Sequence, residues 1–320
     1  MSARTVLFSI TERWFTDMAD LRVNVCGVDF ANPLIAASGT FGFGREYSEF
    51  YPLSELGGIS CKGTTLKARP GNPAPRVTET PGGMLNAVGL QNPGVDHFIE
   101  KDLPWLTQQN TRIIANIAGS NPEDYFEMAA RLDNTDIDMI ELNISCPNVK
   151  AGGAQFGTTV EGVTEITSGV RKNTSKPLMV KLSPNVTDIT EMALAAEAAG
   201  ADCLSLINTL TGMRIDINTG RPIIRNNTGG LSGPAVLPVA IRMVWQVASK
   251  VKVPVIGLGG ISTWQDVVEM MLAGASAVQI GTVLFTDPYA PLKITKGLNE
   301  WLDSKGIKSI NEIVGGIKPW

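Results

Sequence analysis

One cysteine lies in surroundings that would suit a reactive thiol. Cys146 follows an apolar, β-prone stretch, residues 139–144, and precedes Pro147 and a polar, glycine-rich segment. This pattern predicts a buried strand that delivers a thiol into a loop. Asn143 and Asn148 flank the thiol. Because amide side chains offer both donors and an acceptor, the pair suits a planar ligand with adjacent carbonyl and N–H groups. The competing interpretation is a small buried hydrophobe, the commoner role of a free cysteine.

The other cysteines predict no further site, because each lies in or beside an apolar run and none has a polar neighbourhood comparable to that of Cys146: Cys26, Cys61 and Cys203. Four scattered cysteines with no close pair indicate reduced thiols in a cytoplasmic protein. They argue against a disulfide framework, a metal site or an iron–sulfur cluster bound by this chain alone. The single histidine, His97, falls in a helical-looking segment, residues 95–101, away from any strand end. Serine hydrolase chemistry is therefore disfavoured.

The chain is long and apolar enough for a large core, with 320 residues of which 43% are hydrophobic. That size permits one α/β barrel or two ordinary domains. A formal charge of -4 and the lack of basic runs predict no binding to nucleic acid or to an anionic membrane surface. Residues 1–20 mix charged and apolar types, so we expect neither a signal peptide nor a membrane span.

A strand followed by a helical pattern recurs along the chain. The helical segments carry start signals, such as Asn121-Pro122 before residues 125–132 and Asp188 before residues 189–199. Strands that are apolar on both faces predict a (β/α)8 TIM barrel in the α/β class, with a doubly wound sheet as the alternative. The eight expected strands are residues 34–38, 58–62, 113–118, 139–145, 178–183, 203–208, 255–259 and 277–281.

The expected domain organisation is an N-terminal extension, residues 1–20, and a single barrel, residues 21–320, with strand-end insertions. A small hairpin formed by residues 21–25 and 28–30 would precede the barrel. In such barrels the carboxyl ends of the strands hold the active site. These ends are polar here, although barrel interiors favour bulky branched side chains, so their polar groups need ligands or partners. The strand ends carry Ser38, Lys62, Asn116, Asn143, Lys181, Asn208 and Thr209.

The carboxyl ends of the predicted strands indicate two kinds of ligand group. Lys62 and Lys181 each directly follow an apolar strand, where a cation would stabilise charge on a bound ring or hold a substrate carboxylate. The last two strands end in glycine-rich turns, residues 257–261 and 279–282. Backbone N–H groups at such turns attract a phosphate. Together with Gly233, these turns predict a phosphorylated cofactor.

Five motifs together carry a family resemblance. They are Asn-Ile-Ser-Cys-Pro-Asn at 143–148, Lys-Gly-Thr-Thr at 62–65, Asn-Ala-Val-Gly-Leu-Gln-Asn-Pro-Gly at 86–94, Val-Lys-Leu-Ser-Pro-Asn at 180–185 and Ile-Gly-Leu-Gly-Gly-Ile at 256–261. In this combination the chain resembles the catalytic subunits of class 1B dihydroorotate dehydrogenases. The resemblance runs from about Leu21 onward, and only residues 1–20 and 315–320 have no counterpart.

The resemblance implies an FMN-bearing barrel that oxidises (S)-dihydroorotate to orotate in pyrimidine biosynthesis. Cys146 would be the base that takes the proton, while the hydride goes to FMN. The implied FMN-binding residues are Ser38, Lys62, Gly63, Asn116, Asn143, Lys181, Ile207, Gly233, Gly259, Gly260, Gly281 and Thr282. The implied substrate-binding residues are Lys62, Asn86, Ala87, Val88, Gly89, Leu90, Asn143, Asn148, Asn208 and Thr209.

The class also implies an electron acceptor and partners. Electrons would pass to NAD through a second subunit carrying FAD and an iron–sulfur cluster, in a heterotetramer built on a homodimer of this chain. Class 1A relatives use fumarate, but residues 149–157, Val-Lys-Ala-Gly-Gly-Ala-Gln-Phe-Gly, resemble the 1B form. A dihydropyrimidine dehydrogenase-like enzyme would be expected to have His in place of Asn148. The remaining alternative is a non-catalytic barrel that binds a phosphorylated ligand.

Overall fold

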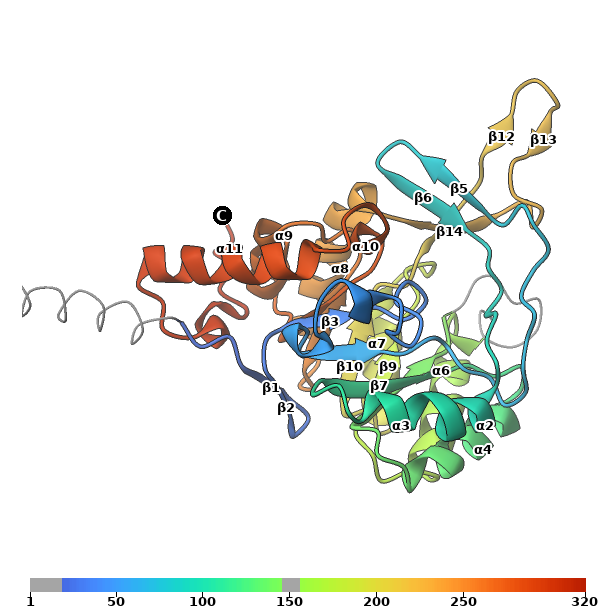
Figure 1. Cartoon of the computed structure of the whole chain (residues 1–320), viewed down its shortest axis with the longest axis horizontal. Coiled ribbons are helices and arrows are strands. Elements are labelled where there is room, and N and C mark those ends of the chain that lie inside the picture. The colour runs from blue at the N-terminus through green and yellow to red at the C-terminus, as the bar shows by residue number, and fades with distance from the viewer. Residues whose placement is uncertain (1–18, 146–155) are drawn as a thin grey trace, which may run out of the picture.

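A computed structural model describes residues 19–145 and 156–320. Eight parallel strands form a closed barrel (Figure 1), and pairing of the last strand with the first completes it. This closure confirms the predicted (β/α)8 barrel and excludes the doubly wound sheet. The barrel strands are β3 (Leu34–Ala36), β4 (Gly58–Ser60), β7 (Arg112–Ile117), β8 (Met139–Asn143), β9 (Leu178–Lys181), β10 (Cys203–Leu206), β15 (Val255–Leu258) and β16 (Ala277–Ile280).

The strands form where the sequence is apolar on both faces, and every residue of β8, β9, β10, β15 and β16 is buried. A parallel sheet covered on both sides requires this pattern. The register then decides which polar side chains meet. Lys181 pairs with Asn143 on one side and with Ser205 on the other. These polar side chains therefore lie at one level of the barrel.

Helices cover the outside of the barrel and begin at the predicted signals. The Asn121 side chain accepts a hydrogen bond from the Asp124 N–H at 2.9 Å, and Asp188 caps the next predicted helix in the same way. The helices are α2 (Val95–His97), which continues through a π-helical turn (Phe98–Asp102) into α3 (Leu103–Leu106), then α4 (Pro122–Asp133), α6 (Val160–Arg171), α7 (Ile189–Ala198), α8 (Leu237–Ala248), α9 (Trp264–Leu272), α10 (Val283–Thr286) and α11 (Ala290–Lys305). Short 3₁₀ turns span Tyr47–Glu49, Leu53–Glu55, Pro234–Val236 and Ile310–Ile313.

The predicted N-terminal hairpin is confirmed. Strands β1 (Val23–Val25) and β2 (Val28–Phe30) pair antiparallel. The Arg112 Nε at the start of β7 donates to the Asp29 carbonyl at 2.7 Å, which holds the hairpin at the amino-terminal ends of the barrel strands. The hairpin therefore closes the end of the barrel opposite the predicted site.

Two insertions after barrel strands build a second sheet. Strands β5 (Val77–Thr80) and β6 (Gly83–Asn86) follow β4, whereas β11 (Leu210–Gly212) and β14 (Gly229–Ser232) follow β10. They pair in the order β11-β14-β6-β5, and Figure 1 shows the hairpin of β12 (Ile215–Asp216) and β13 (Arg221–Pro222) projecting beyond them. The predicted strand-end insertions are thus present. In the described part of the chain, no helix has the length and apolar character to cross a membrane.

Candidate active site

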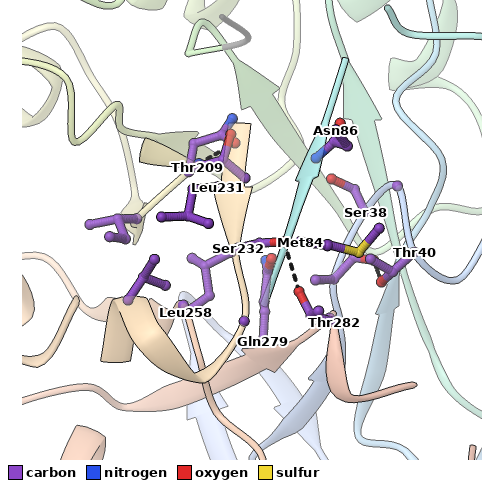
Figure 2. A pocket seen from close by; sticks show the side chains of 18 of the residues that line it. Ser38, Thr40, Met84, Asn86, Thr209, Leu231, Ser232, Leu258, Gln279 and Thr282 are labelled. Atoms are coloured by element: carbon purple, nitrogen blue, oxygen red, sulfur yellow. Dashed lines mark hydrogen bonds between the residues drawn. The ribbon is translucent and has the colours of Figure 1, made fainter. Parts of the chain in front are cut away.

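A pocket opens at the carboxyl ends of the barrel strands, between the barrel and the small sheet. Figure 2 shows Ser38 and Asn86 approaching it from one side, and Thr209 and Leu231 from the other. Most residues proposed from the sequence line this pocket together: Ser38, Lys62, Gly63, Asn86, Val88, Gly89, Leu90, Asn143, Lys181, Ile207, Asn208, Thr209, Gly233, Gly259, Gly260, Gly281 and Thr282.

Four proposed residues are not among the lining residues. Asn116 is buried beneath the pocket, where its side-chain carbonyl accepts from Asn143 at 3.5 Å. Ala87 is buried and packs in a small core of the second sheet. Cys146 and Asn148 lie outside the described residues. Their proposed roles therefore remain predictions.

A buried ion pair lies beneath the pocket, and its cation lines the pocket floor. The Lys181 side chain is only 5% exposed, and its Nζ lies 3.8 Å from Oε1 of the fully buried Glu141. It also lies 3.4 Å from the Gln279 side-chain carbonyl. A buried cation requires such compensation, because desolvation is costly without a counter-charge. Lys181 thus brings a positive charge to the pocket floor, where a ligand ring would contact it.

Glu141 is a polar residue that the sequence reasoning missed. Burial raises the pKa of its carboxyl, but Lys181 and hydrogen bonds from Ser60, Gln279 and Asn116 outweigh burial, so the pKa is held below its usual value. The residue is therefore an ionised carboxylate inside the barrel. The available signal was a charged residue at the centre of an otherwise apolar strand, which is rare unless the charge is paired.

The glycine-rich turns that were predicted to bind a phosphate meet on one side of the pocket. Gly233, Gly259 and Gly260 have positive φ angles of 108°, 123° and 82°, a region that side chains disfavour. Thr282 donates from its Oγ1 to the Ser232 Oγ at 2.9 Å (Figure 2). Turns from three different strands therefore present backbone and small polar groups to the same space.

We expect Gly260→Ala to weaken retention of the phosphorylated cofactor by at least about tenfold. An added Cβ would lie 2.7 Å from the Leu237 nitrogen and 2.9 Å from the Gly233 carbonyl oxygen, so the turn would have to shift. Gly306→Ala is the matched control, since φ there is positive as well, at +67°, but nothing lies within 4 Å of the added Cβ. Release of the FMN that the sequence resemblance implies, measured after ultrafiltration, checks the expectation, and equal release from both variants would contradict the turn's role.

Several other lining residues were also missed because insertions bring them in. Met84, Val77 and Leu231 come from the second sheet, and Leu258 is the last residue of β15. They give the pocket apolar walls beside its polar floor. Only the tertiary pairing of two distant insertions places Met84, Val77 and Leu231 here, and no local pattern marked these three as lining residues. Leu258 belongs to a barrel strand that the sequence predicted. Gln279, in contrast, was visible as a lone amide within an apolar strand.

The described cysteines pack as hydrophobes, as predicted. Burial raises the pKa of the Cys61 thiol, and a hydrogen bond with Cys26 together with burial raises that of Cys203. Within residues 19–145 and 156–320, no group of three or more His, Cys, Asp or Glu side chains is placed to hold a metal ion. The His97 side chain is half exposed, and its Nδ1 lies 3.2 Å from Oδ2 of the buried Asp102.

Known proteins with this sequence pattern identify the family. The family model described as dihydroorotate dehydrogenase matches residues 20–302. The chain is 56% identical over 302 residues to a Bacteroides thetaiotaomicron protein named dihydroorotate dehydrogenase B (NAD(+)), catalytic subunit, and the match covers 94% of this chain and 100% of that protein. Proteins of the same name from Alkaliphilus metalliredigens (55% over 298 residues; 93% and 99% covered) and Geotalea uraniireducens (54% over 299 residues; 93% and 98% covered) are similar. This chain therefore belongs to the dihydroorotate dehydrogenase family.

Proposed function

We propose that this chain is the catalytic subunit of a class 1B, NAD-dependent dihydroorotate dehydrogenase in pyrimidine biosynthesis, and that it oxidises (S)-dihydroorotate to orotate with FMN as its bound cofactor. The observation that carries the proposal is the match over 94% of the chain to relatives named as NAD-type catalytic subunits. The pocket supports it, because the polar side chains expected for this chemistry converge there from separate strands.

The pocket fits FMN in three respects. Its walls are apolar, formed by Ile207, Leu231 and Leu258, which suits a flat ring system. Its floor carries the Lys181 cation, and the turns around Gly259, Gly260 and Thr282 offer backbone groups for a phosphate. Bound FMN would supply the acceptor for the hydride that leaves carbon 6 of dihydroorotate.

The chain's own residues have the remaining tasks. Lys181 would stabilise negative charge on a bound ring from the pocket floor. Lys62, which lines the pocket, would hold the substrate carboxylate. Asn143 and Asn208 would hydrogen-bond the polar edge of the pyrimidine. Cys146 would accept the proton that leaves carbon 5, since a base must face the substrate for this step.

A partner subunit is proposed to carry electrons onward. The relatives are named catalytic subunits, and this chain has only four cysteines, none closely spaced. We therefore assign FAD and an iron–sulfur cluster to the partner, with a homodimer of this chain as the core of the assembly. The free thiols of Cys26, Cys61 and Cys203 fit a cytoplasmic location.

We expect the purified chain to be yellow and its flavin to be bleached anaerobically by dihydroorotate but not by dihydrouracil. NAD reduction should be slow with this chain alone and fast once its FAD and iron–sulfur partner is added, because the chain lacks cluster ligands. Absorbance of the flavin and of NADH follows both steps. A colourless protein that takes up no FMN would refute the flavoenzyme assignment, and fast NAD reduction without a partner would refute the 1B assignment.

A further inference from the structure

The carboxylate of Glu141 accepts hydrogen bonds from four neutral side chains. Ser60 Oγ and Asn116 Nδ2 donate to Oε2 at 2.5 and 2.6 Å. Ser205 Oγ and Gln279 Nε2 donate to Oε1, both at 2.8 Å. Since an ionised carboxylate only accepts, both amides must turn their NH₂ groups toward it. Their carbonyl oxygens must then point elsewhere.

From Asn116 a chain of hydrogen bonds runs up to the pocket. The Asn116 carbonyl accepts from Asn143 Nδ2 at 3.5 Å, and the Asn143 carbonyl accepts from the hydroxyl and the backbone N–H of Ser145 at 3.3 and 3.4 Å. The Ser145 hydroxyl in turn accepts from Asn208 Nδ2 at 2.7 Å. In every bond of this hydrogen-bond chain, the donor lies on the pocket side and the acceptor on the side of Glu141.

The hydrogen bond at the upper end of this hydrogen-bond chain, at Asn208, also fixes which way the amide faces. The Asn208 carbonyl accepts from the Thr209 backbone N–H at 2.7 Å, a donor that cannot reverse. Each of Asn143 and Asn208 uses one side-chain N–H in the chain, and within residues 19–145 and 156–320 the second has no acceptor. Both residues line the pocket. The two amides thus offer it N–H donors, while their carbonyls are engaged.

We propose that Glu141 is a positioning residue that fixes the direction of this hydrogen-bond chain at its lower end, while the backbone N–H groups of Ser145 and Thr209 fix it above. Asn143 and Asn208 then present N–H donors to carbonyl oxygens of the bound pyrimidine. The inference rests on the proposed function in taking orotate as the ligand. Glu141 itself does not line the pocket and acts through Asn116. A glutamine in its place keeps one acceptor oxygen but replaces the other with an NH₂ group, which would face side chains that now donate. With that NH₂ group on the Oε2 side, Asn116 would have to reverse against Asn143.

The test is a thermodynamic cycle that combines the Glu141→Gln substitution with the replacement of a ligand carbonyl oxygen by sulfur, which is a weak hydrogen-bond acceptor. Dissociation constants of orotate, 2-thioorotate and 4-thioorotate are measured on the FMN-loaded chain from the change in flavin absorbance. In the unmodified chain, we expect at least one sulfur analogue to bind about tenfold more weakly than orotate. In Glu141→Gln, orotate should bind about tenfold more weakly, and the sulfur penalty should shrink to about twofold.

Glu197→Gln is the matched control. Its carboxylate accepts the Lys252 and Val253 N–H groups at 2.6 and 3.0 Å, away from the pocket, so both orotate affinity and the sulfur penalty should be unchanged. Flavin content, read from the ratio of visible to ultraviolet absorbance, should stay the same in both variants. Should Glu141→Gln fail to fold, Ser145→Ala serves as the second variant. It removes the hydroxyl that links Asn208 to Asn143 without changing charge, and it should shrink the sulfur penalty in the same way.

An unchanged sulfur penalty in a folded Glu141→Gln or Ser145→Ala variant would overturn the inference, even if all three ligands bound more weakly. That result would mean that Glu141 is only structural. Failure of the proposed function would look different, because the unmodified chain would then bind no orotate. The inference would fall with the proposed function in that case.

Discussion

Cys146→Ala is expected to retain FMN and to slow flavin reduction by dihydroorotate by a factor of about 10² to 10⁴, the usual contribution of a positioned general base. The substrate must lose a proton from carbon 5 as the hydride leaves carbon 6, and alanine accepts no proton. Cys146 directly follows Ser145, whose buried hydroxyl bonds both Asn143 and Asn208 at the pocket. Stopped-flow absorbance of the flavin under anaerobic conditions measures the rate.

Cys26→Ala is the control for this prediction, because Cys26 lies at the turn of the N-terminal hairpin, away from the pocket. It should reduce its flavin at the unmodified rate. A Cys146→Ala chain that also did so would remove Cys146 from the mechanism. Loss of FMN from that variant would likewise contradict a role confined to proton transfer.

Lys181→Met should cost about 3–5 kcal/mol in the free energy of unfolding, because it leaves a buried carboxylate without its counter-charge. Glu141 is fully buried, and the Lys181 side chain is 5% exposed. Lys296→Met is the matched control. Its ion pair with Glu300 has the same 3.8 Å separation, but the two side chains are 77% and 68% exposed, so the loss should stay below about 1 kcal/mol. Urea unfolding measures both.

The cost of Lys181→Met should depend on pH. In the unmodified chain the pKa of Glu141 lies below its usual 4.5, so its contribution to stability is present above that value and is lost as pH falls through the lower folded pKa. Without Lys181 the pKa of Glu141 should rise, because the attraction of the cation is lost while burial, the largest influence on this carboxyl, remains. Protonation should then relieve part of the penalty as pH falls. The difference in stability should therefore be largest near about pH 7 and smaller near about pH 5. A difference that does not change with pH would mean that Glu141 is not its source.

The barrel was predictable because its signals are local. Each strand is a short run that is apolar on both faces, and caps such as Asn121 and Asp188 mark helix starts within one turn. Eight repeats of that unit define the fold class. The polar strand ends, including Lys62, Asn143 and Lys181, stood out against the apolar strands before them, and the structure places these three in one pocket.

The second sheet and its contribution to the pocket were not predictable in the same way. Strands β6 and β14 are separated by more than 140 residues and pair through backbone hydrogen bonds that carry little sequence information. Their lining residues, such as Met84 and Leu231, look like ordinary loop or strand residues. Pairing between distant segments is decided by the whole fold.

By itself the sequence determined which residue types stand at the strand ends, and hence the barrel, the part of the pocket lining that the barrel strands supply, and the family. Only the tertiary structure decided how those groups are connected. Glu141 and Asn116 lie on the neighbouring strands β8 and β7, and the barrel register brings their side chains within hydrogen-bonding distance. Periodicity shows that a polar group is buried, but it does not show which group is its partner. The partner decides the charge of the buried group and the direction of its hydrogen bonds, and it follows from packing across strands that the sequence does not place side by side.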